Sequence, residues 1–108
     1  MTARLAAGML VSALIRRAEE LGGNGVVLAK GDASAGALLI QLAQRGVPGD
    51  LLERRLDERG VYRWSPTGPG DAERRDDYLV RRRRSDPDLW VLELDVADAM
   101  KLVEDIAG

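Results

Sequence analysis

The sequence predicts one α+β domain over residues 1–108, in which about three helices pack against a mainly antiparallel sheet of about five strands. Three observations predict this fold. Apolar residues recur at helical spacing in the first and last segments, and shorter apolar runs separated by glycine- or proline-containing turns lie between them. Hydrophobic residues make up 45% of the 108 positions, which suffices for one packed core without a metal or a disulfide.

The first helical stripe ends at Gly22 and Gly23, since glycine accepts the left-handed conformation that closes a helix. Ser12 is a possible N-cap, which would leave residues 4–10 extended. The apolar run after Arg4 resembles the core of a signal peptide, but charged residues follow it and it is too short to span a membrane. We therefore expect a buried helix and a cytoplasmic protein. The stripe consists of Ala7, Leu10, Val11, Leu14, Ile15, Ala18 and Leu21.

A polar loop containing Gly31, Asp32 and Gly36 separates two apolar runs, residues 26–29 and 37–43. This pattern predicts a β-hairpin, whose second strand is apolar almost throughout, as is typical of a central strand. The loop follows a strand as phosphate-binding loops do, yet it lacks their glycine spacing and no helix follows it. We interpret it as a hairpin loop in which Asp32 accepts hydrogen bonds from nearby amides.

Residues 47–50, Val-Pro-Gly-Asp, predict the next turn. The segment 51–64 allows two interpretations, a second hairpin about Asp57–Gly60 or a helix followed by a strand. Its charge content and the i, i+4 spacing of Leu52 and Leu56 keep the helix alternative open. We favour the hairpin.

Residues 71–84 predict a helix with acidic residues in its first turns and arginines in its last, the order that the helix dipole favours. Pro87 disfavours helical conformation in the residue before it, so this helix ends by Arg84 or Ser85. Residues 90–95 alternate in character and predict a strand with one better-buried face. A short helix closes the chain with the apolar residues Met100, Val103 and Ile106 or Ala107.

Histidine and cysteine are both absent, which excludes a zinc site of the usual ligands, a thiolate nucleophile and every histidine-based catalytic dyad. The net charge of −2 does not favour binding to a polyanion. Charge is nevertheless unevenly distributed. Residues 72–84 hold six arginines against three acids, a local +3, and residues 85–108 hold seven acids against one lysine, a local −6.

The arginine run 81–84 offers two interpretations. Successive residues of a helix turn by about 100°, so the four side chains point in different directions and cannot all meet one flat surface. One interpretation is a phosphate-binding patch formed by Arg74, Arg75 and Arg82.

The other interpretation is a solvated helix end, which we favour because of the overall charge. In that case Arg83 lies along the edge of the core with its head group paired. One arginine would then be tied into the turn of Asp86 and Asp88.

Glu93 and Asp95 share one face of the predicted strand and offer oxygen ligands for Mg²⁺ or Ca²⁺. Together with Asp88 they suggest a metal-dependent hydrolase. We favour salt bridges to the preceding arginines. Trp90 alternates with leucines and is expected in the core. Trp64, beside a loop rich in proline and glycine, is the better candidate for an exposed anchor at a protein interface.

The segments "VSALIRR", "VLAKGD", "AGALLI" and, most specifically, "SDPDLWVLELD" resemble a small alphaproteobacterial family of about this length, a domain of unknown function. The resemblance extends over nearly the whole chain and implies a cytoplasmic single-domain protein. It implies no catalytic residue, ligand or partner.

Our leading functional hypothesis is a non-enzymatic interaction module that binds another protein or itself through a sheet edge or the arginine-rich helix. The first alternative is a weak nucleic-acid-binding protein that uses the helix 71–84, and the second is the carboxylate-dependent hydrolase. We expect no cofactor and no membrane contact. The candidate interaction residues are Trp64, Arg74, Arg75, Arg82, Asp86 and Asp88.

Overall fold

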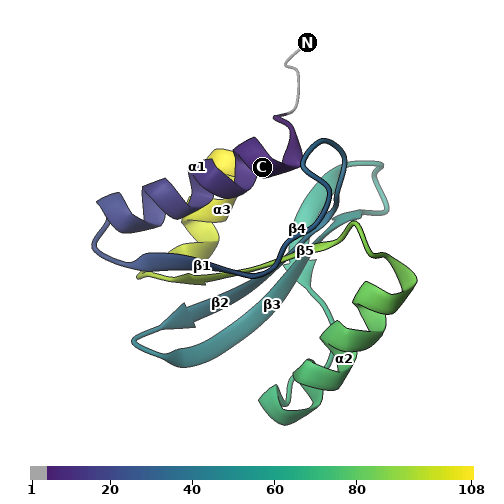
Figure 1. Cartoon of the computed structure of the whole chain (residues 1–108). Helices are drawn as coiled ribbons and strands as arrows, with labels where there is room; N and C mark the ends of the chain where they lie inside the picture. The colour runs from purple at the N-terminus through teal and green to yellow at the C-terminus, as the bar shows by residue number, and fades with distance from the viewer. Residues whose placement is uncertain (1–4) are drawn as a thin grey trace.

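The computed structural model describes residues 5–108, and this part of the chain contains three helices and five strands (Figure 1). Arg4 lies outside the described residues. In chain order the elements are α1 (Ala7–Glu20), β1 (Asn24–Ala29), β2 (Leu38–Gln44), β3 (Val47–Leu56), β4 (Tyr62–Pro66), α2 (Ala72–Ser85), β5 (Trp90–Asp95) and α3 (Ala99–Ala107).

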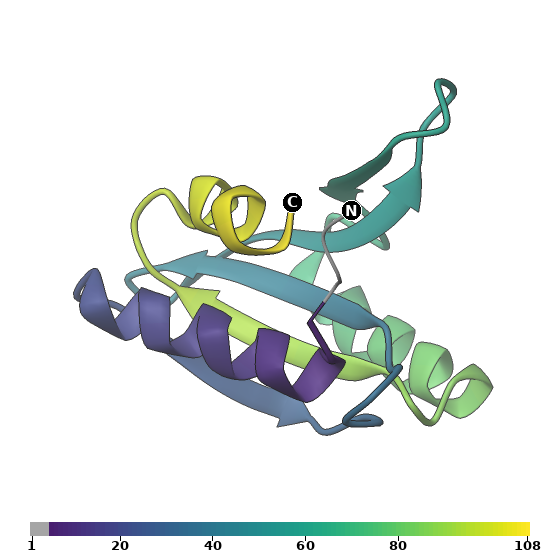
Figure 2. The ribbon, with the colours of Figure 1, turned by 90° about the horizontal axis from the view of Figure 1, so that it is seen from above.

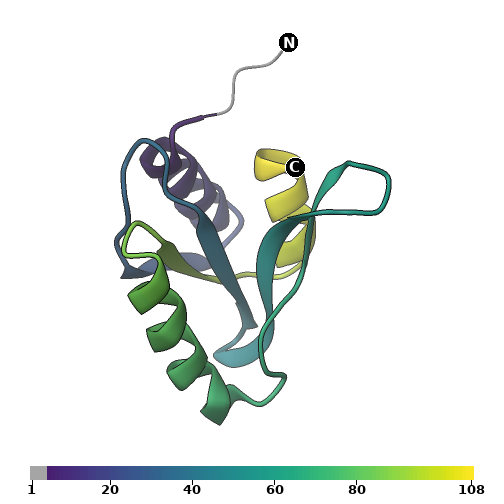
Figure 3. The same ribbon diagram turned by 90° about the vertical axis from the view of Figure 1, so that its right-hand side faces the viewer.

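The strands form one sheet in the order β1-β5-β2-β3-β4. Neighbouring strands are antiparallel except β2 and β5, which are parallel. Helices α1 and α3 lie on one face of the sheet and α2 lies on the other, as Figures 1 and 3 show. This arrangement confirms the predicted α+β fold with its mainly antiparallel sheet of five strands and its three helices.

Two apolar cores lie on the two faces of the sheet, because successive strand residues point to opposite sides. The larger core lies under α1 and α3 and receives, among others, Leu14, Ile40, Leu92 and Val103. The smaller core lies under α2 and contains Leu39, Leu51 and Leu89, with Tyr78 and Leu79 packed against them.

The predicted hairpin of residues 26–29 and 37–43 is wrong, because β1 and β2 do not pair. Strand β5 lies between them, antiparallel to β1 and parallel to β2. Its side chains are almost entirely buried, so β5 takes a central position with neighbours at both edges. The loop between β1 and β2 crosses the start of β5 closely. A Cβ atom on Gly31 or Gly36 would lie 2.1 or 2.3 Å from the carbonyl oxygen of Asp88.

The turn after β2 lies at Arg45 and Gly46 and not at residues 47–50, which begin β3. Both turn residues have positive φ, 53° and 78°, which suits a tight two-residue hairpin. Pro48 is accommodated in the strand because it pairs with Ala43 where the register of β2 and β3 shifts. The second predicted hairpin, β3–β4, is confirmed, so its first half is strand and not helix.

Helix α1 begins at Ala7, so the predicted N-cap at Ser12 and the extended segment before it are wrong. The amides of Ala7 and Gly8 donate to the carbonyl oxygens of Ser34 (3.4 Å) and Ala33 (2.9 Å). These carbonyls of the loop between β1 and β2 replace a side-chain cap, which α1 lacks. The glycine turn that ends α1 is as predicted.

Candidate functional site

Helix α2 carries the arginine run and has the boundaries that its sequence predicts. The Asp71 side chain caps it by accepting a hydrogen bond from the Glu73 amide (2.9 Å), and the helix ends at Ser85, before Pro87. Its six arginines differ in environment. Arg75 is buried, Arg82 and Arg83 are half-buried, and Arg74, Arg81 and Arg84 are exposed.

Arg75, only 8% exposed, fastens the first half of α2 to the sheet. Its Nη1 donates to Gln41 Oε1 (3.1 Å) and to the carbonyl oxygen of Gly49. Its Nε donates to the Pro69 carbonyl (2.9 Å), and its Nη2 donates to the Gly70 carbonyl (3.3 Å). A buried charge with four acceptors is a structural link, since guanidinium is stable in the interior only when its donors are satisfied.

Arg82 fastens the second half of α2 through a two-point ion pair with Glu53 of β3. The distances are 2.6 Å from Nη2 to Oε2 and 3.0 Å from Nη1 to Oε1. Nη1 also donates to the Tyr78 hydroxyl (2.8 Å), which lies 3.2 Å from the Thr67 hydroxyl. The Arg82 guanidinium beside Glu53 is the main cause that lowers the pKa of this carboxyl, and the same pair raises the pKa of Arg82.

The turn after α2 is closed by its own polar groups. Arg83 lies at the edge of the core, and its Nη2 is bound as predicted, because it donates to the carbonyls of Lys30 (3.0 Å) and Pro87 (3.2 Å). Its buried Nε has no hydrogen-bond partner within residues 5–108. Asp86 Oδ1 accepts from the Asp88 amide (3.1 Å). The backbone of Asp88 in turn accepts from the Asp32 amide (3.0 Å), which joins this turn to the loop after β1.

The three arginines of the nucleic-acid hypothesis do not form one free patch. Arg74 is exposed, whereas Arg75 is buried and Arg82 is paired with Glu53. A phosphate could reach the latter two only by displacing their partners in the fold. The salt-bridge partner of Arg82 is Glu53 of β3, which the sequence did not indicate.

The carboxylates of the metal hypothesis are not brought together. No group of three or more acidic residues in the described part of the chain is arranged to hold a metal ion. Asp95 accepts hydrogen bonds from the amides of Arg45 and Gly46, both at 2.8 Å, and so holds the β2–β3 turn. The predicted salt bridges of Glu93 and Asp95 to the preceding arginines are absent from the ion pairs within residues 5–108.

The expectation that Trp64 is exposed is wrong, because its side chain is only 8% exposed. Trp64 lies on the face of β4 that meets α3, where its Nε1 donates to the carbonyl oxygen of Ala107 (3.1 Å). Trp90 lies in the core as predicted, and its Nε1 donates to the Asp32 carbonyl (2.7 Å). The loop around Asp32 has the expected local bonds, from the amides of Ser34 and Ala35.

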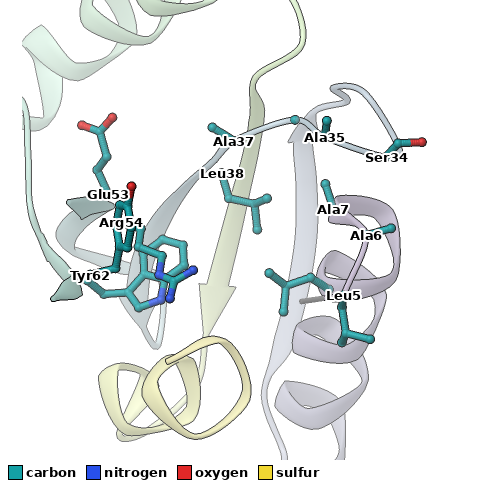
Figure 4. A pocket seen from close by; sticks show the side chains of 13 residues that line it. Leu5, Ala6, Ala7, Ser34, Ala35, Ala37, Leu38, Glu53, Arg54 and Tyr62 are labelled. Atoms are coloured by element: carbon teal, nitrogen blue, oxygen red, sulfur yellow. The ribbon is translucent and has the colours of Figure 1, made fainter. Parts of the chain in front are cut away.

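A pocket of about 570 Å³ lies between the start of α1 and the β3–β4 hairpin (Figure 4). Leu5 and Ala7 form one wall, and Arg54 and Tyr62 form the opposite wall, with the Arg54 guanidinium 5.2 Å from the centre of the Tyr62 ring. The carboxylate of Glu53 points away from the pocket in this view. The pocket therefore combines apolar surface with one cation that stacks on an aromatic ring.

The edge of the sheet at β1 is exposed and apolar. β1 is the outermost strand on one side, and the β3–β4 hairpin lies on the other (Figure 2). Val26, Val27 and Leu28 are 47%, 39% and 51% exposed, and β1 contains neither a charged residue nor a proline. The opposite edge strand β4 is protected by Arg63 and Pro66, the devices that usually prevent strand addition.

A groove of about 640 Å³ adjoins the β1 edge on the α2 side of the sheet. Its apolar lining consists of Leu28, Ala29, Leu79, Val80, Pro87 and Val91. Arg83, Arg84 and Asp76 add two cations and one anion to its rim. We call the exposed residues of β1 together with this groove the β1 surface. It offers unpaired backbone groups of an edge strand beside an apolar trough with a basic end.

The sequence did not indicate the β1 surface. The run 26–29 was expected to be covered by a hairpin partner, and only the insertion of β5 places it at an edge. The absence of charge in this strand was the one available signal.

Of the six predicted interaction residues, Arg74 and Asp88 are exposed, whereas Trp64, Arg75, Arg82 and Asp86 are engaged within the fold.

The sequence profile of a family described as "Protein of unknown function (DUF1491)" matches residues 5–104. The chain belongs to this family. Its fold is similar to the crystal structure of a DUF1491 family protein from Caulobacter crescentus CB15, with 35% identity and a TM-score of 0.75 over 91% of this chain and 94% of that one. An NMR structure of a DUF1491 family protein from the same organism matches at 35% identity and TM-score 0.75 over 94% of each chain.

The solution structure of protein Atu0922 from A. tumefaciens is also similar, with 32% identity and a TM-score of 0.71 over 89% of each chain. These organisms are alphaproteobacteria, which confirms the family resemblance seen in the sequence. The comparison with curated proteins finds no match. Within residues 5–108 no helix has the length and apolar character needed to cross a membrane.

Proposed function

We propose that the protein is a non-enzymatic interaction module that docks another polypeptide strand on the β1 surface. The observation that carries this proposal is the uncharged edge strand with three consecutive exposed apolar residues, Val26, Val27 and Leu28. An edge of this kind presents a row of unpaired amides and carbonyls, and proteins usually protect such edges unless a partner pairs with them. Strand addition uses the backbone groups for affinity and the adjoining pockets for specificity.

The groove beside β1 supports this proposal. A strand added next to β1 would place alternate side chains over Leu28 and Val80, which are exposed although they are apolar. The two arginines on the rim favour an acidic residue of the partner beside Arg84. Arg75 and Arg82 act in this proposal as supports that hold α2, and with it one wall of the groove, at a fixed distance from the sheet.

Site-specific photo-crosslinking in the protein's own host cells tests the proposal. Benzoylphenylalanine is placed at Leu28 in one variant and, as a matched control, at Val61 in another. Val61 is 48% exposed and lies at the tip of the β3–β4 hairpin, at the other edge of the sheet (Figure 2). We expect a discrete adduct from Leu28 and none from Val61. Equal labelling of both positions, or no adduct at Leu28, would contradict a docking role for β1.

A further inference from the structure

We infer that the strand docked on the β1 surface belongs to a second copy of this chain, so that two five-stranded sheets join through their β1 edges. This inference rests on the proposed function and names the partner. In an isologous pair related by a twofold axis, each surface must complement itself. The β1 surface meets this requirement both in its apolar residues and in its charges.

The directions of the β1 side chains determine how the β1 strands of two copies pair. Val26 pairs with Glu93 of β5, and Leu28 lines the groove, so both side chains lie on the α2 side of the sheet. Directly opposed residues of antiparallel strands share a face. Antiparallel pairing of two β1 strands about Val27 therefore sets Val26 of one copy opposite Leu28 of the other, twice. The irregularity between Val27 and Ala29 keeps Leu28 directed to the groove.

The same pairing brings opposite charges together. Arg84 lines the same groove as Leu28, and Glu93 lies one strand inward from Val26. The Glu93 of the second copy is then about two strand spacings, roughly 10 Å, from the first copy's Leu28. Because Arg84 lines the same groove as Leu28, its long side chain can extend across this span toward the glutamate. Among the ion pairs within residues 5–108, none uses Arg84 or Glu93, so both are available to a second copy.

An added peptide of another protein would use the same edge, but nothing would then require Glu93 to lie within reach of Arg84 of its neighbour. An ion pair between Arg84 and Glu93 therefore distinguishes binding of a second copy from binding of a strand of another protein. Twofold symmetry forms this pair twice, so each substitution acts twice in the dimer.

Charge reversal measured by sedimentation velocity tests the inference. The wild-type chain is compared with Arg84→Glu, with Glu93→Arg and with the double variant, over protein concentrations from micromolar to millimolar. Arg81→Glu is the matched control, because Arg81 is an exposed arginine of α2 outside the groove. We expect a wild-type dimer, a dissociation constant raised about tenfold or more by either single reversal, and recovery to within about threefold in the double variant. The control is expected to behave as the wild type.

Two results would overturn the inference. One is a wild-type chain that stays monomeric at every concentration. The other is a dimer in which the double variant is weakened further instead of restored. A monomeric chain that still gives a Leu28-dependent adduct with a different protein would overturn the second copy and leave the proposed function in place. Leu28→Lys, which puts a charge into the apolar pairing, is expected to abolish the dimer independently of Arg84.

Discussion

Replacement of Arg75 by methionine tests whether the arginines of α2 act inside the fold. The neighbouring Arg74 provides the matched control, because the two residues are adjacent in the same helix and only one of them is buried. Methionine keeps much of the volume of the side chain and removes its charge and its donors. A loss of stability in Arg75→Met alone would therefore report the hydrogen bonds of the guanidinium.

The expected magnitude comes from the acceptors that lose their partner. Gln41 Oε1 is buried with Arg75, and an unsatisfied buried acceptor costs about 1–3 kcal/mol. The three carbonyls of Gly49, Pro69 and Gly70 are partly buried, so water replaces part of those bonds. Relief of the buried charge offsets some of the loss. We expect a net loss of about 3 kcal/mol for Arg75→Met, and a change within about 0.5 kcal/mol for Arg74→Met.

Urea unfolding followed by tryptophan fluorescence is a suitable assay, since Trp64 and Trp90 both lie in the core. With a denaturant dependence of about 1.5 kcal/mol/M, a loss of 3 kcal/mol lowers the midpoint by about 2 M. Equal midpoints for the two variants would refute the assignment of Arg75 as a buried structural link. Arg75 would then be free to contact phosphate, as the nucleic-acid hypothesis requires.

Three further predictions test other parts of the structure. The pKa of Glu53 is lowered in the folded state, so the stability that this residue contributes is present above its ordinary pKa of 4.5 and is lost as pH falls through the folded value. The Glu53→Gln variant should therefore be less stable than the wild type at pH 7, and its free energy of unfolding should change less between pH 3 and 6. Parallel pH profiles of unfolding for the two proteins would argue against the ion pair with Arg82. Gly31→Ala should destabilise by about 2 kcal/mol or more in thermal melts, because its Cβ would lie 2.1 Å from the Asp88 oxygen, whereas Gly70→Ala, with no atom within 4 Å, should be nearly neutral. Trp64→Phe removes the hydrogen bond to Ala107 and should cost about 1 kcal/mol and speed amide exchange at the end of α3; unchanged exchange there would contradict this contact.

The local elements could be predicted from the sequence because their signals are local. The helix after Asp71 has its cap, its acidic start, its basic end and the following proline within seventeen residues, and the structure follows them. The β3–β4 hairpin likewise has its turn at Asp57–Gly60. The closing helix was also expected, although Leu102 and Ala99 are buried together with Val103.

The order of strands could not be read from neighbouring residues. Two apolar runs around a glycine loop have the same pattern whether they pair with each other or receive a third strand between them. The cause of the insertion is the burial of β5 on both faces, a property of the assembled sheet. The wrong strand order also affected the functional prediction, because a hairpin partner would have covered Val26 and Leu28, which are in fact exposed.

Side-chain partners across the sheet were equally inaccessible from the sequence. Arg82 was expected to contact phosphate or to lie on a solvated helix end, whereas its partner Glu53 lies on β3, far away along the chain. Trp64 was expected at the surface because of the loop beside it, whereas the end of α3 covers its ring and accepts its hydrogen bond. In both cases the determining contact joins two elements whose relative position depends on the whole fold.

A dilution series of amide NMR spectra tests the central claim most directly, because it reports which surface changes when the chains associate. We predict concentration-dependent shifts confined to β1 and to the groove residues Val80 and Arg84, together with Glu93, and slower exchange of the outward-facing β1 amides at high concentration. Shifts centred on β4 or on the pocket beside Tyr62, or spectra that do not change with concentration, would contradict self-association through the β1 surface.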